Sequence, residues 1–376
     1  MDCIAYPSTA TGPALFARRE GWDALRPQWQ RLWEESGAPV FSSPAWLEAW
    51  WREFGQGDIR QGLLLFALRH GRAIPLRGSP GPGGSGIEGE RLVGVVPLMQ
   101  ADEREGRLSL AGSPDVCDYA TMVIAPGAEK EALEALLAAL AEEGWQELAL
   151  WGLPSDWPHL DCLRELGPAR GYDVQVEMEA VCPRIALTPT WSSYLASLPK
   201  AERHELRRKL RRIAKEGGRL HFYHVDTASE VAEALPVFLH QLAESQEAKA
   251  RFLNEAMARF FSRMAVALAE QGLLRLYFLE LEGVRVASLM AFARGDAIYL
   301  YNSGYDPRFS PLAVGLVSKA MCVQQAIDEG RRFLDFLRGD ERYKYELGAK
   351  DREVYRCLLS FPTRPGLRLS PRRGRP

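Results

Sequence analysis

The sequence predicts an α+β protein built from two tandem lobes of one type, each a mixed, mostly antiparallel sheet flanked by helices. Its 376 residues are too many for one ordinary core, and 47% hydrophobic with 26% charged residues is globular usage. Both halves show the same order of parts: strands, a loop with an aspartate, a long helix that ends at a glycine, and an apolar strand. An offset of 186 residues maps the helix, glycine and strand of one half onto the other. Any α/β chain can show such an order by chance, but the shared offset favours an internal duplication.

The first half is expected to begin with two helices. Tryptophans spaced i, i+7 and i+11 indicate a helix within residues 19–55. A second helix follows over residues 45–54, because Ser43 suits its N-cap and Pro44 suits its first helical position.

Two short apolar runs, 63–68 and 92–98, are typical of strands. The segment between them, residues 77–90, is rich in glycine and proline and is expected to be a flexible linker. It holds a formal G-x-G-x-x-G match, but prolines interrupt the match and a strand follows it where a helix would be needed. We therefore expect no dinucleotide site there.

The second half is expected to contain a strongly basic helix over residues 200–216 with one narrow apolar stripe. Three apolar segments separated by glycine turns, 274–281, 285–294 and 297–303, indicate an antiparallel meander. The other expected elements are helices at 129–143, 230–244, 254–270 and 312–329, and strands at 146–151, 174–187, 220–225, 333–337 and 354–361.

Composition and charge exclude several classes of protein. With 47 Lys and Arg against 49 Asp and Glu, the chain is not built throughout to coat nucleic acid. No apolar run approaches the roughly 18 residues that span a bilayer, and the N-terminus lacks the pattern of a signal peptide. The six cysteines are scattered and form no C-x-x-C pair, which argues against a zinc site or a disulfide framework. We expect a cytoplasmic protein with no metal and no membrane span.

Local sequences in both halves resemble one known family. In the first half these are FSSPAWLEAWWREFG, LVGVVPLM and CDYATMVIAPG, and in the second LYFLELEGVRVASLMAF, IYLYNSGYDPRF and FLDFLRGDERYKYELGA. They resemble the Fem/CelD-like branch of the GNAT acyltransferase superfamily, from about Phe41 to Phe361. The last stretch is the most specific. The chain lacks the long helical hairpin of many Fem ligases, and it looks closer to the CelD-like acetyltransferases.

The resemblance implies two GNAT-type lobes, with the acyl donor and the acceptor meeting in or beside the cleft between them. We expect the lobes at 1–188 and 189–365 and a basic flexible tail at 366–376. The implied activity moves an acyl group, acetyl from acetyl-CoA or another acyl-CoA, onto an amine of a small molecule or of a cell-envelope or polysaccharide precursor. Two alternatives stay open: a Fem-like aminoacyltransferase that uses aminoacyl-tRNA, and a non-catalytic accessory protein of envelope polysaccharide synthesis.

GNAT enzymes hold the CoA pyrophosphate on backbone N–H groups at a helix N-terminus, which is a general anion site. The equivalent segment here is DPRFSPLAVG, residues 306–315, where the resemblance assigns cofactor binding to Arg308, Ser310 and Gly315. The family signature [QR]-x-x-G-x-[GA] is largely missing, which leaves CoA itself open. The same residues also suit an ordinary turn followed by a capped helix.

A polar cluster directly follows the apolar strand at 333–337, where α/β folds often place functional side chains. The resemblance assigns Asp340 to accept the amine proton and Tyr343 to protonate a leaving thiolate. Arg338 and Lys344 are assigned to bind an anionic group of the substrate. The alternative is that these side chains tie a loop to the sheet.

Asp118 and Tyr119 occupy the matching position of the first half. Asp118 is assigned as a base or as the group that orients the acceptor amine, and an Asx-type turn is the alternative. Tyr119, Trp46 and Tyr305 are assigned to substrate binding, although aromatic residues on an amphipathic helix are more often core.

The basic helix carries eight Lys and Arg residues within 200–215, and three glutamates lie in the same helix, 200–216. It is a candidate site for a phosphate-bearing ligand such as tRNA or a nucleotide. A solvated helical face is the ordinary explanation of such a pattern, and we prefer it.

Overall fold

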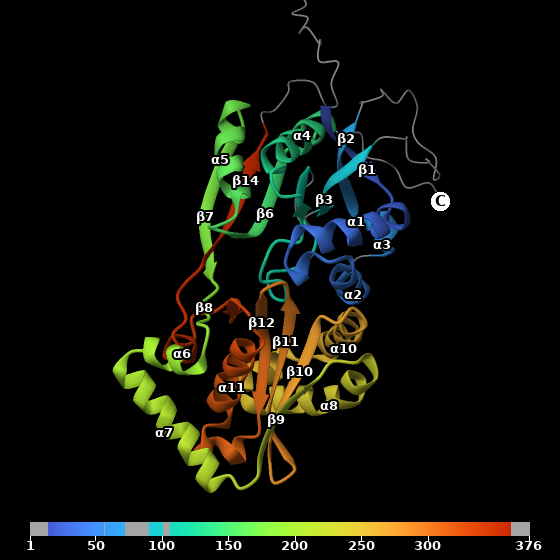
Figure 1. Ribbon diagram of the computed structural model, residues 1–376. Helices are drawn as coiled ribbons and strands as arrows, with labels where there is room; N and C mark the ends of the chain where they lie inside the picture. The colour runs from blue at the N-terminus through green and yellow to red at the C-terminus, as the bar shows by residue number, and fades with distance from the viewer. Residues whose placement is uncertain (1–13, 56, 72–89, 101–105, 362–376) are drawn as a thin grey trace, which may run out of the picture.

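The computed structural model describes residues 14–55, 57–71, 90–100 and 106–361. The expected linker at 77–90, apart from Glu90, and the tail at 366–376 lie outside the described residues. Within the described part the chain forms two sheets, each flanked by helices, so the predicted α+β fold class is confirmed (Figure 1).

The first sheet has the strand order β1-β2-β3-β4-β6-β14-β7, with β5 paired to β3. Its strands are β1 Ala14–Glu20, β2 Leu64–Gly71, β3 Arg91–Gln100, β4 Arg107–Leu110, β5 Val123–Ile124, β6 Glu147–Pro154, β7 Asp173–Val181 and β14 Glu353–Ser360. The helices around it are α1 Trp22–Ser36, α2 Pro44–Phe54, α3 Ile59–Gly62, α4 Glu129–Glu142 and α5 Pro158–Ala169, and the 3₁₀ helix η1 Val40–Ser42 precedes α2.

The second sheet has the order β8-β13-β12-β11-β10-β9. Its strands are β8 Arg184–Ala186, β9 Leu220–Val225, β10 Leu274–Leu281, β11 Val284–Arg294, β12 Ala297–Tyr305 and β13 Phe333–Asp335. The helices are α6 Trp191–Ser197, α7 Lys200–Glu216, α8 Ala228–Ser245, α9 Glu247–Phe252, α10 Glu255–Ala269, α11 Val314–Asp328 and α12 Arg342–Glu346, with the 3₁₀ helix η2 Pro307–Leu312 before α11.

Local sequence signals account for most of these boundaries. The Ser43 hydroxyl accepts the backbone N–H of Trp46 at 3.2 Å, as expected for the N-cap of α2. The offset of 186 residues maps Gly144 onto Gly330 and the first residue of β6 onto the first residue of β13. The repeated helix, glycine and strand order is therefore present in both lobes.

The two sheets exchange strands, which the sequence analysis did not anticipate. The strand expected at 174–187 is broken at Cys182–Pro183 into β7, in the first sheet, and β8, which pairs with β13 in the second. Conversely, β14 belongs to the second half of the chain but lies in the first sheet, where it pairs with β6 on one side and β7 on the other. Figure 1 shows β14 running up beside β7 into the first lobe.

The strand exchange between the two sheets predicts which strands lose protection when β14 is removed. A chain that ends at Arg352 leaves β6 and β7 without their shared neighbour, although the missing residues come from the second half. We expect faster hydrogen exchange at the amides of β6 and β7 than at those of β10 and β11. The opposite order, with β10 and β11 losing protection first, would contradict this assignment of β14.

In both lobes, two neighbouring strands run parallel for only three residue pairs. β4 pairs with β6 over Arg107–Ser109, and β12 pairs with β13 over Ala297–Tyr299. In the first lobe the chain after β4 folds back across β6, where the Ala120 amide donates to the Gly152 carbonyl at 2.8 Å. Gly152 has φ +67°, and a Cβ there would lie 2.7 Å from the Ala120 nitrogen, so only glycine fits. This contact fixes the loop that carries Asp118.

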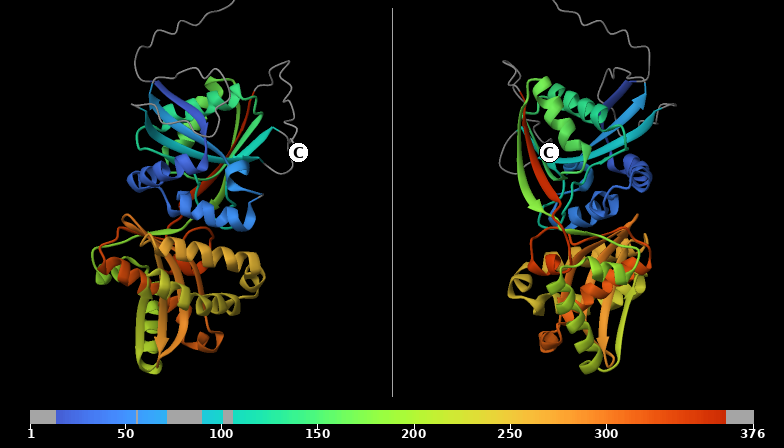
Figure 2. Two further views of the ribbon diagram at one scale, coloured as in Figure 1. Left: turned by 90° about the vertical axis from the view of Figure 1, so that its right-hand side faces the viewer. Right: turned by 60° about the vertical axis from the view of Figure 1, so that its left-hand side comes forward.

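The lobes share one aromatic core at their junction. Trp46 of α2 is fully buried, with ring centroids 5.6 Å from Phe260 and Phe292 and 5.5 Å from Tyr301 of the second lobe. Helix α2 lies against α10, as Figure 2 shows where the two lobes meet. Trp46 was assigned to substrate binding, but in the structure its indole N–H donates to the Cys117 sulfur at 3.1 Å inside the core.

Candidate active site

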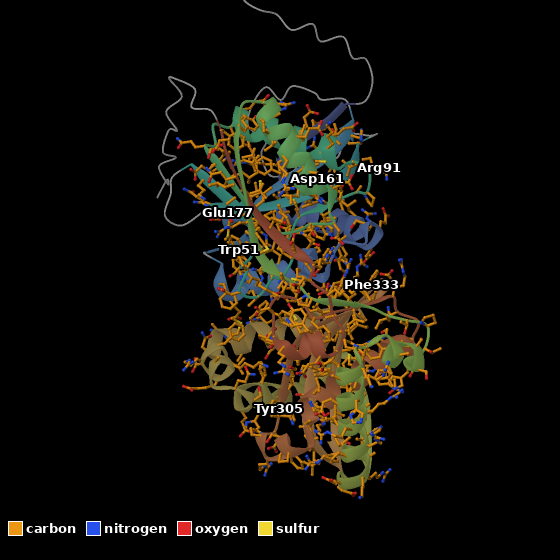
Figure 3. The ribbon with its side chains drawn as sticks, turned by 90° about the vertical axis from the view of Figure 1, so that its left-hand side faces the viewer. Trp51, Arg91, Asp161, Glu177, Tyr305 and Phe333 are labelled. Atoms are coloured by element: carbon orange, nitrogen blue, oxygen red, sulfur yellow. The ribbon has the colours of Figure 1, made fainter. Side chains whose placement is uncertain are left out.

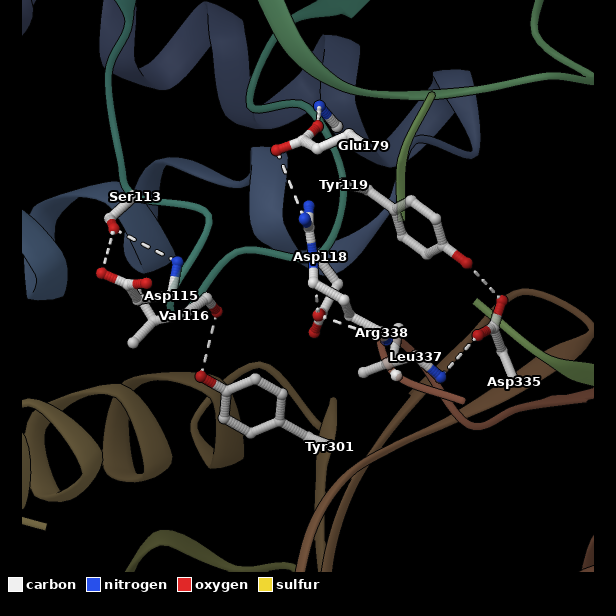
Figure 4. Close-up of polar contacts among 12 residues, drawn as sticks. Ser113, Asp115, Val116, Asp118, Tyr119, Glu179, Tyr301, Asp335, Leu337 and Arg338 are labelled. Carbon is white, nitrogen blue, oxygen red and sulfur yellow. Dashed lines mark hydrogen bonds and ion pairs between the residues drawn. The ribbon is translucent and has the colours of Figure 1, made fainter. Parts of the chain in front are cut away.

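Residues from both lobes meet where β13 ends (Figure 4). The Tyr119 hydroxyl of the first lobe donates to Asp335 Oδ2 at 2.7 Å, and the Leu337 amide donates to Asp335 Oδ1 at 2.8 Å. Arg352 Nη1 lies 3.9 Å from Asp335 Oδ2. Asp335 is buried. Because it accepts from both Tyr119 and Leu337, it anchors the start of the 336–344 segment to the first lobe.

Asp118, Arg338 and Glu179 form a second link beside the first. The Arg338 backbone N–H donates to Asp118 Oδ1 at 3.3 Å, and its Nε lies 3.8 Å from the same oxygen. Arg338 Nη1 lies 3.3 Å from Glu179 Oε1, while Glu179 Oε2 accepts the Gly152 amide at 2.9 Å. Nε and Nη2 of Arg338 are buried without a hydrogen-bond partner. The arrangement thus holds a carboxylate and a guanidinium with unused donors at the lobe junction.

The charge state of Asp118 is adjusted by its surroundings. Burial raises the pKa of Asp118 to about 6, against the opposing attraction of Arg338, and the nearby Asp335 carboxylate raises it further. The side chain is still 13% exposed. Asp118 is therefore a carboxylate at neutral pH that accepts a proton readily, which suits a general base.

Lys344 holds the loop that presents Arg338. Its Nζ donates to the carbonyls of Leu337, Arg338 and Gly339 at 3.0, 2.9 and 2.9 Å, and it also lies 2.9 Å from Glu341 Oε2. Leu337 sits in the left-handed region with φ 58°, and the lysine stabilises this conformation. Lys344 was assigned to bind substrate, but it is buried and its donors are engaged with the loop.

The three residues assigned to acid–base chemistry differ in their surroundings. Asp118 lies with Arg338, whereas Asp340 is exposed and takes no part in the hydrogen bonds described above. Tyr343 packs its ring edge-on against Phe336 at 5.9 Å, and burial raises the pKa of Tyr343. The roles of these residues in catalysis stay predictions.

The segment assigned to cofactor binding lies in the second lobe. The Asp306 carboxylate accepts the Arg308 backbone N–H at 2.9 Å and lies 2.6 Å from Arg308 Nη2, and these bonds hold the pKa of Asp306 below its usual value. Arg308 is nevertheless 81% exposed, and Ser310 is exposed beside it. Gly315 lies in the first turn of α11, where a Cβ would approach the Tyr305 ring to 3.1 Å. Tyr305 therefore packs on the helix start, away from the lobe junction (Figure 3).

The sequence analysis did not single out two lysines of the second lobe, of which Lys319 is buried and Lys249 is half-buried. Lys319 of α11 is 6% exposed, donates to the Gly315 carbonyl at 3.0 Å, and has its Nζ 4.7 Å from the centre of the Tyr343 ring. Lys249 of α9 donates to the Ser303 carbonyl of β12 at 2.6 Å. Lys319 interrupts the apolar face of its helix, and Asp335 likewise interrupts an apolar strand. A charged residue inside an apolar pattern is the sequence signal that could have pointed to Lys319 and Asp335.

Among the described residues, no three or more His, Cys, Asp or Glu side chains gather as a metal site would require, and no helix there is long and apolar enough to cross a bilayer. A surface hollow between α2 and α10 is lined by residues such as Arg26, Glu48 and Arg263. It shares no residue with the Asp118–Arg338 cluster.

Comparison with known proteins adds the following. Residues 200–345 match the family model of the acetyltransferase (GNAT) domain. Among solved structures, FemX is similar over 88% of this chain and 95% of its own, with 13% identity and a TM-score of 0.58. A conserved protein of unknown function from Bacteroides thetaiotaomicron is similar over 90% and 97%, with 14% identity and a TM-score of 0.55. At such identities the likeness concerns the fold alone. No curated protein matches the sequence.

Proposed function

We propose that this chain, whose residues 200–345 match the GNAT acetyltransferase domain and whose two-lobed fold is similar to that of FemX, is an N-acyltransferase. It moves an acyl group, acetyl from acetyl-CoA, onto an amine of a small molecule or of a cell-envelope or polysaccharide precursor. The observation that carries the proposal is that the fold brings Asp118 of the first lobe to the Arg338 loop of the GNAT domain. We keep 1–188 and 189–365 as the proposed lobes, the first holding the acceptor and the second the donor.

The chain's own residues divide the chemistry as follows. Asp118 takes a proton from the ammonium form of the acceptor, the neutral amine nitrogen attacks the thioester carbonyl carbon, and the carbon–sulfur bond breaks. Tyr343 donates its proton to the leaving thiolate, and its phenolate then takes up the excess proton of the new amide nitrogen. Arg338 carries two unused buried donors for the developing negative charge on the carbonyl oxygen. Asp340, which is exposed, is the alternative group for accepting the amine proton.

The residues present fit a long donor with an anionic end. Helix α11 has 15 residues and no side-chain cap, and its Leu316 amide already donates to the Ala313 carbonyl at 3.0 Å, so the amides of Val314 and Gly315 are the ones proposed to receive a phosphate. Tyr305, beside this helix start, and Tyr301, whose hydroxyl donates to the Val116 carbonyl near Asp118, are about 13 Å apart along β12. A CoA thioester would supply the activated acyl group, with Arg308, Ser310 and Gly315 holding its diphosphate.

A Fem-like aminoacyltransferase is the second candidate, and helix α7 is the observation that favours it. Arg208 and Arg212 pair with glutamates of the same helix, whereas Arg207 and Arg211 are exposed. Such a face could take the phosphates of tRNA. A non-catalytic accessory protein is the third candidate.

Acetyl-CoA should raise the melting temperature of the full chain at millimolar concentration and compete with desulfo-CoA. Absence of any shift would argue strongly against an acyl-CoA donor. Retention of charged tRNA that is lost on neutralising Arg207 and Arg211 would favour the second candidate. Binding without turnover, unchanged by Tyr343→Phe, would favour the third.

A further inference from the structure

Three lysine side chains and one glutamate gather in the second lobe between β12 and the 336–344 segment. The Nζ of Lys344 is already fully engaged, because it donates to three loop carbonyls and pairs with Glu341. Lys319 and Lys249 each make one hydrogen bond, to a main-chain carbonyl, so each ammonium keeps two N–H groups for another partner. The positive charges thus outnumber the nearby carboxylate, which is costly in a buried place.

Lys249 lies close enough to Lys319 for its charge to affect the protonation of Lys319. The pKa of Lys319 is lowered to about 7, chiefly by burial and also by the charges of Lys249 and Lys344, while Glu341 and Cys322 oppose this lowering. Burial also lowers the pKa of Lys249. The site reaches solvent on one side, since Glu341 is largely exposed and Lys249 is half-buried. An anion entering from that side would meet both ammonium groups.

We propose that Lys249 and Lys319 form a carboxylate-binding site along β12, and that one substrate of the transfer carries a carboxylate group. This inference rests on the proposed function for its link to a substrate, but the site itself does not. The two carbonyl oxygens that accept from the lysines, those of Ser303 and Gly315, remain beside any bound anion. They repel a phosphate, which brings up to two charges and four oxygens to one site, more than the carboxylate group at one end of succinate, which brings one charge on two oxygens that match two ammonium groups.

The test uses the full chain titrated with succinate, and separately with inorganic phosphate, at constant ionic strength. Succinate should bind to the wild type at pH 6.5, and Lys319→Met and Lys249→Met should each weaken binding at least tenfold. Lys319→Arg should retain it, because the charge is kept. Lys215→Met, an exposed lysine of α7, is the matched control and should leave the affinity unchanged. The methionine variants should fold, since each replaces a lysine with an apolar chain of similar length.

Protonation gives a second readout. Since an anion favours the charged form of Lys319, succinate binding should take up protons near pH 7 and weaken as the pH rises above it. Tighter binding of phosphate than of succinate, or binding that survives Lys319→Met, would overturn the proposal. Succinate binding that is lost in Lys319→Met while acetyl-CoA has no effect would uphold the site and reject the acyl-CoA donor. Acetyl transfer by a protein that does not bind succinate would uphold the acyl-CoA donor and reject the carboxylate site.

Discussion

Replacing Asp118 by Asn should abolish most of the activity while making the folded protein more stable. A general base contributes roughly 10²–10⁴-fold to such a reaction, so kcat/KM should fall by at least about 100-fold. In the wild type, log kcat/KM should rise with pH up to about 6, where Asp118 loses its proton, and then level off. This rise of log kcat/KM below about pH 6, the acid limb of the profile, should be absent from the variant. Rates measured from pH 5 to 8 test both statements.

The stability effect of the same substitution follows from the sign of the shift. The folded-state pKa of Asp118 lies above its ordinary value, so this group favours folding below about pH 4 and loses that contribution as the pH rises to about 6. Above pH 6 the buried charge is a cost. Asn cannot ionise, and the free energy of unfolding at pH 8 should therefore rise by roughly 2 kcal/mol.

Asp115 offers the matched control for Asp118. It lies on the same loop, is exposed, and accepts a hydrogen bond from the Ser113 hydroxyl at 3.1 Å. Asp115→Asn should change neither the pH profile nor the stability by more than about 0.5 kcal/mol. An Asp118→Asn variant that keeps the acid limb would show that another group accepts the proton.

Replacing Lys344 by Met should be the most destabilising change in the second lobe. The substitution leaves the carbonyls of Leu337, Arg338 and Gly339 without their buried donor, in a loop whose Leu337 has a positive φ. Each unsatisfied group costs about 1–3 kcal/mol, so the free energy of unfolding should fall by roughly 3–5 kcal/mol. Denaturant titration measures this. Activity should fall as well, because the loop presents Arg338 to Asp118.

Arg342 is the matched control on the same short helix. Its side chain is 90% exposed and pairs with Glu346 in water. Arg342→Ala should change the free energy of unfolding by less than about 0.5 kcal/mol. A Lys344→Met variant as stable as Arg342→Ala would contradict the positioning role of Lys344 and would leave the lysine free for substrate.

Features that depend on near neighbours in the sequence were predicted well. The cap at Ser43, the meander of β10, β11 and β12, and the basic helix α7 all follow from periodicity, turn residues and charge over short windows. Helix α5 was missed, because Pro168 lies inside it and its segment is rich in turn-forming residues. For the candidate site, the sequence pointed to Asp118, Tyr119 and Arg338, which the structure does bring together.

What the sequence by itself determined is therefore most of the long helices and strands, their repeated order and the segments that carry polar clusters. Only the tertiary structure decided the exchange of β8 and β14 between the sheets, since a strand's edge carries no local record of its partner. It also decided that Trp46 lies in the hydrophobic core, that Lys344 binds the carbonyls of a loop, and that Asp335 and Lys319 are buried charged residues. Burial and partnership are properties of three-dimensional neighbours. In this chain they come from residues hundreds of positions apart, as with Tyr119 and Asp335.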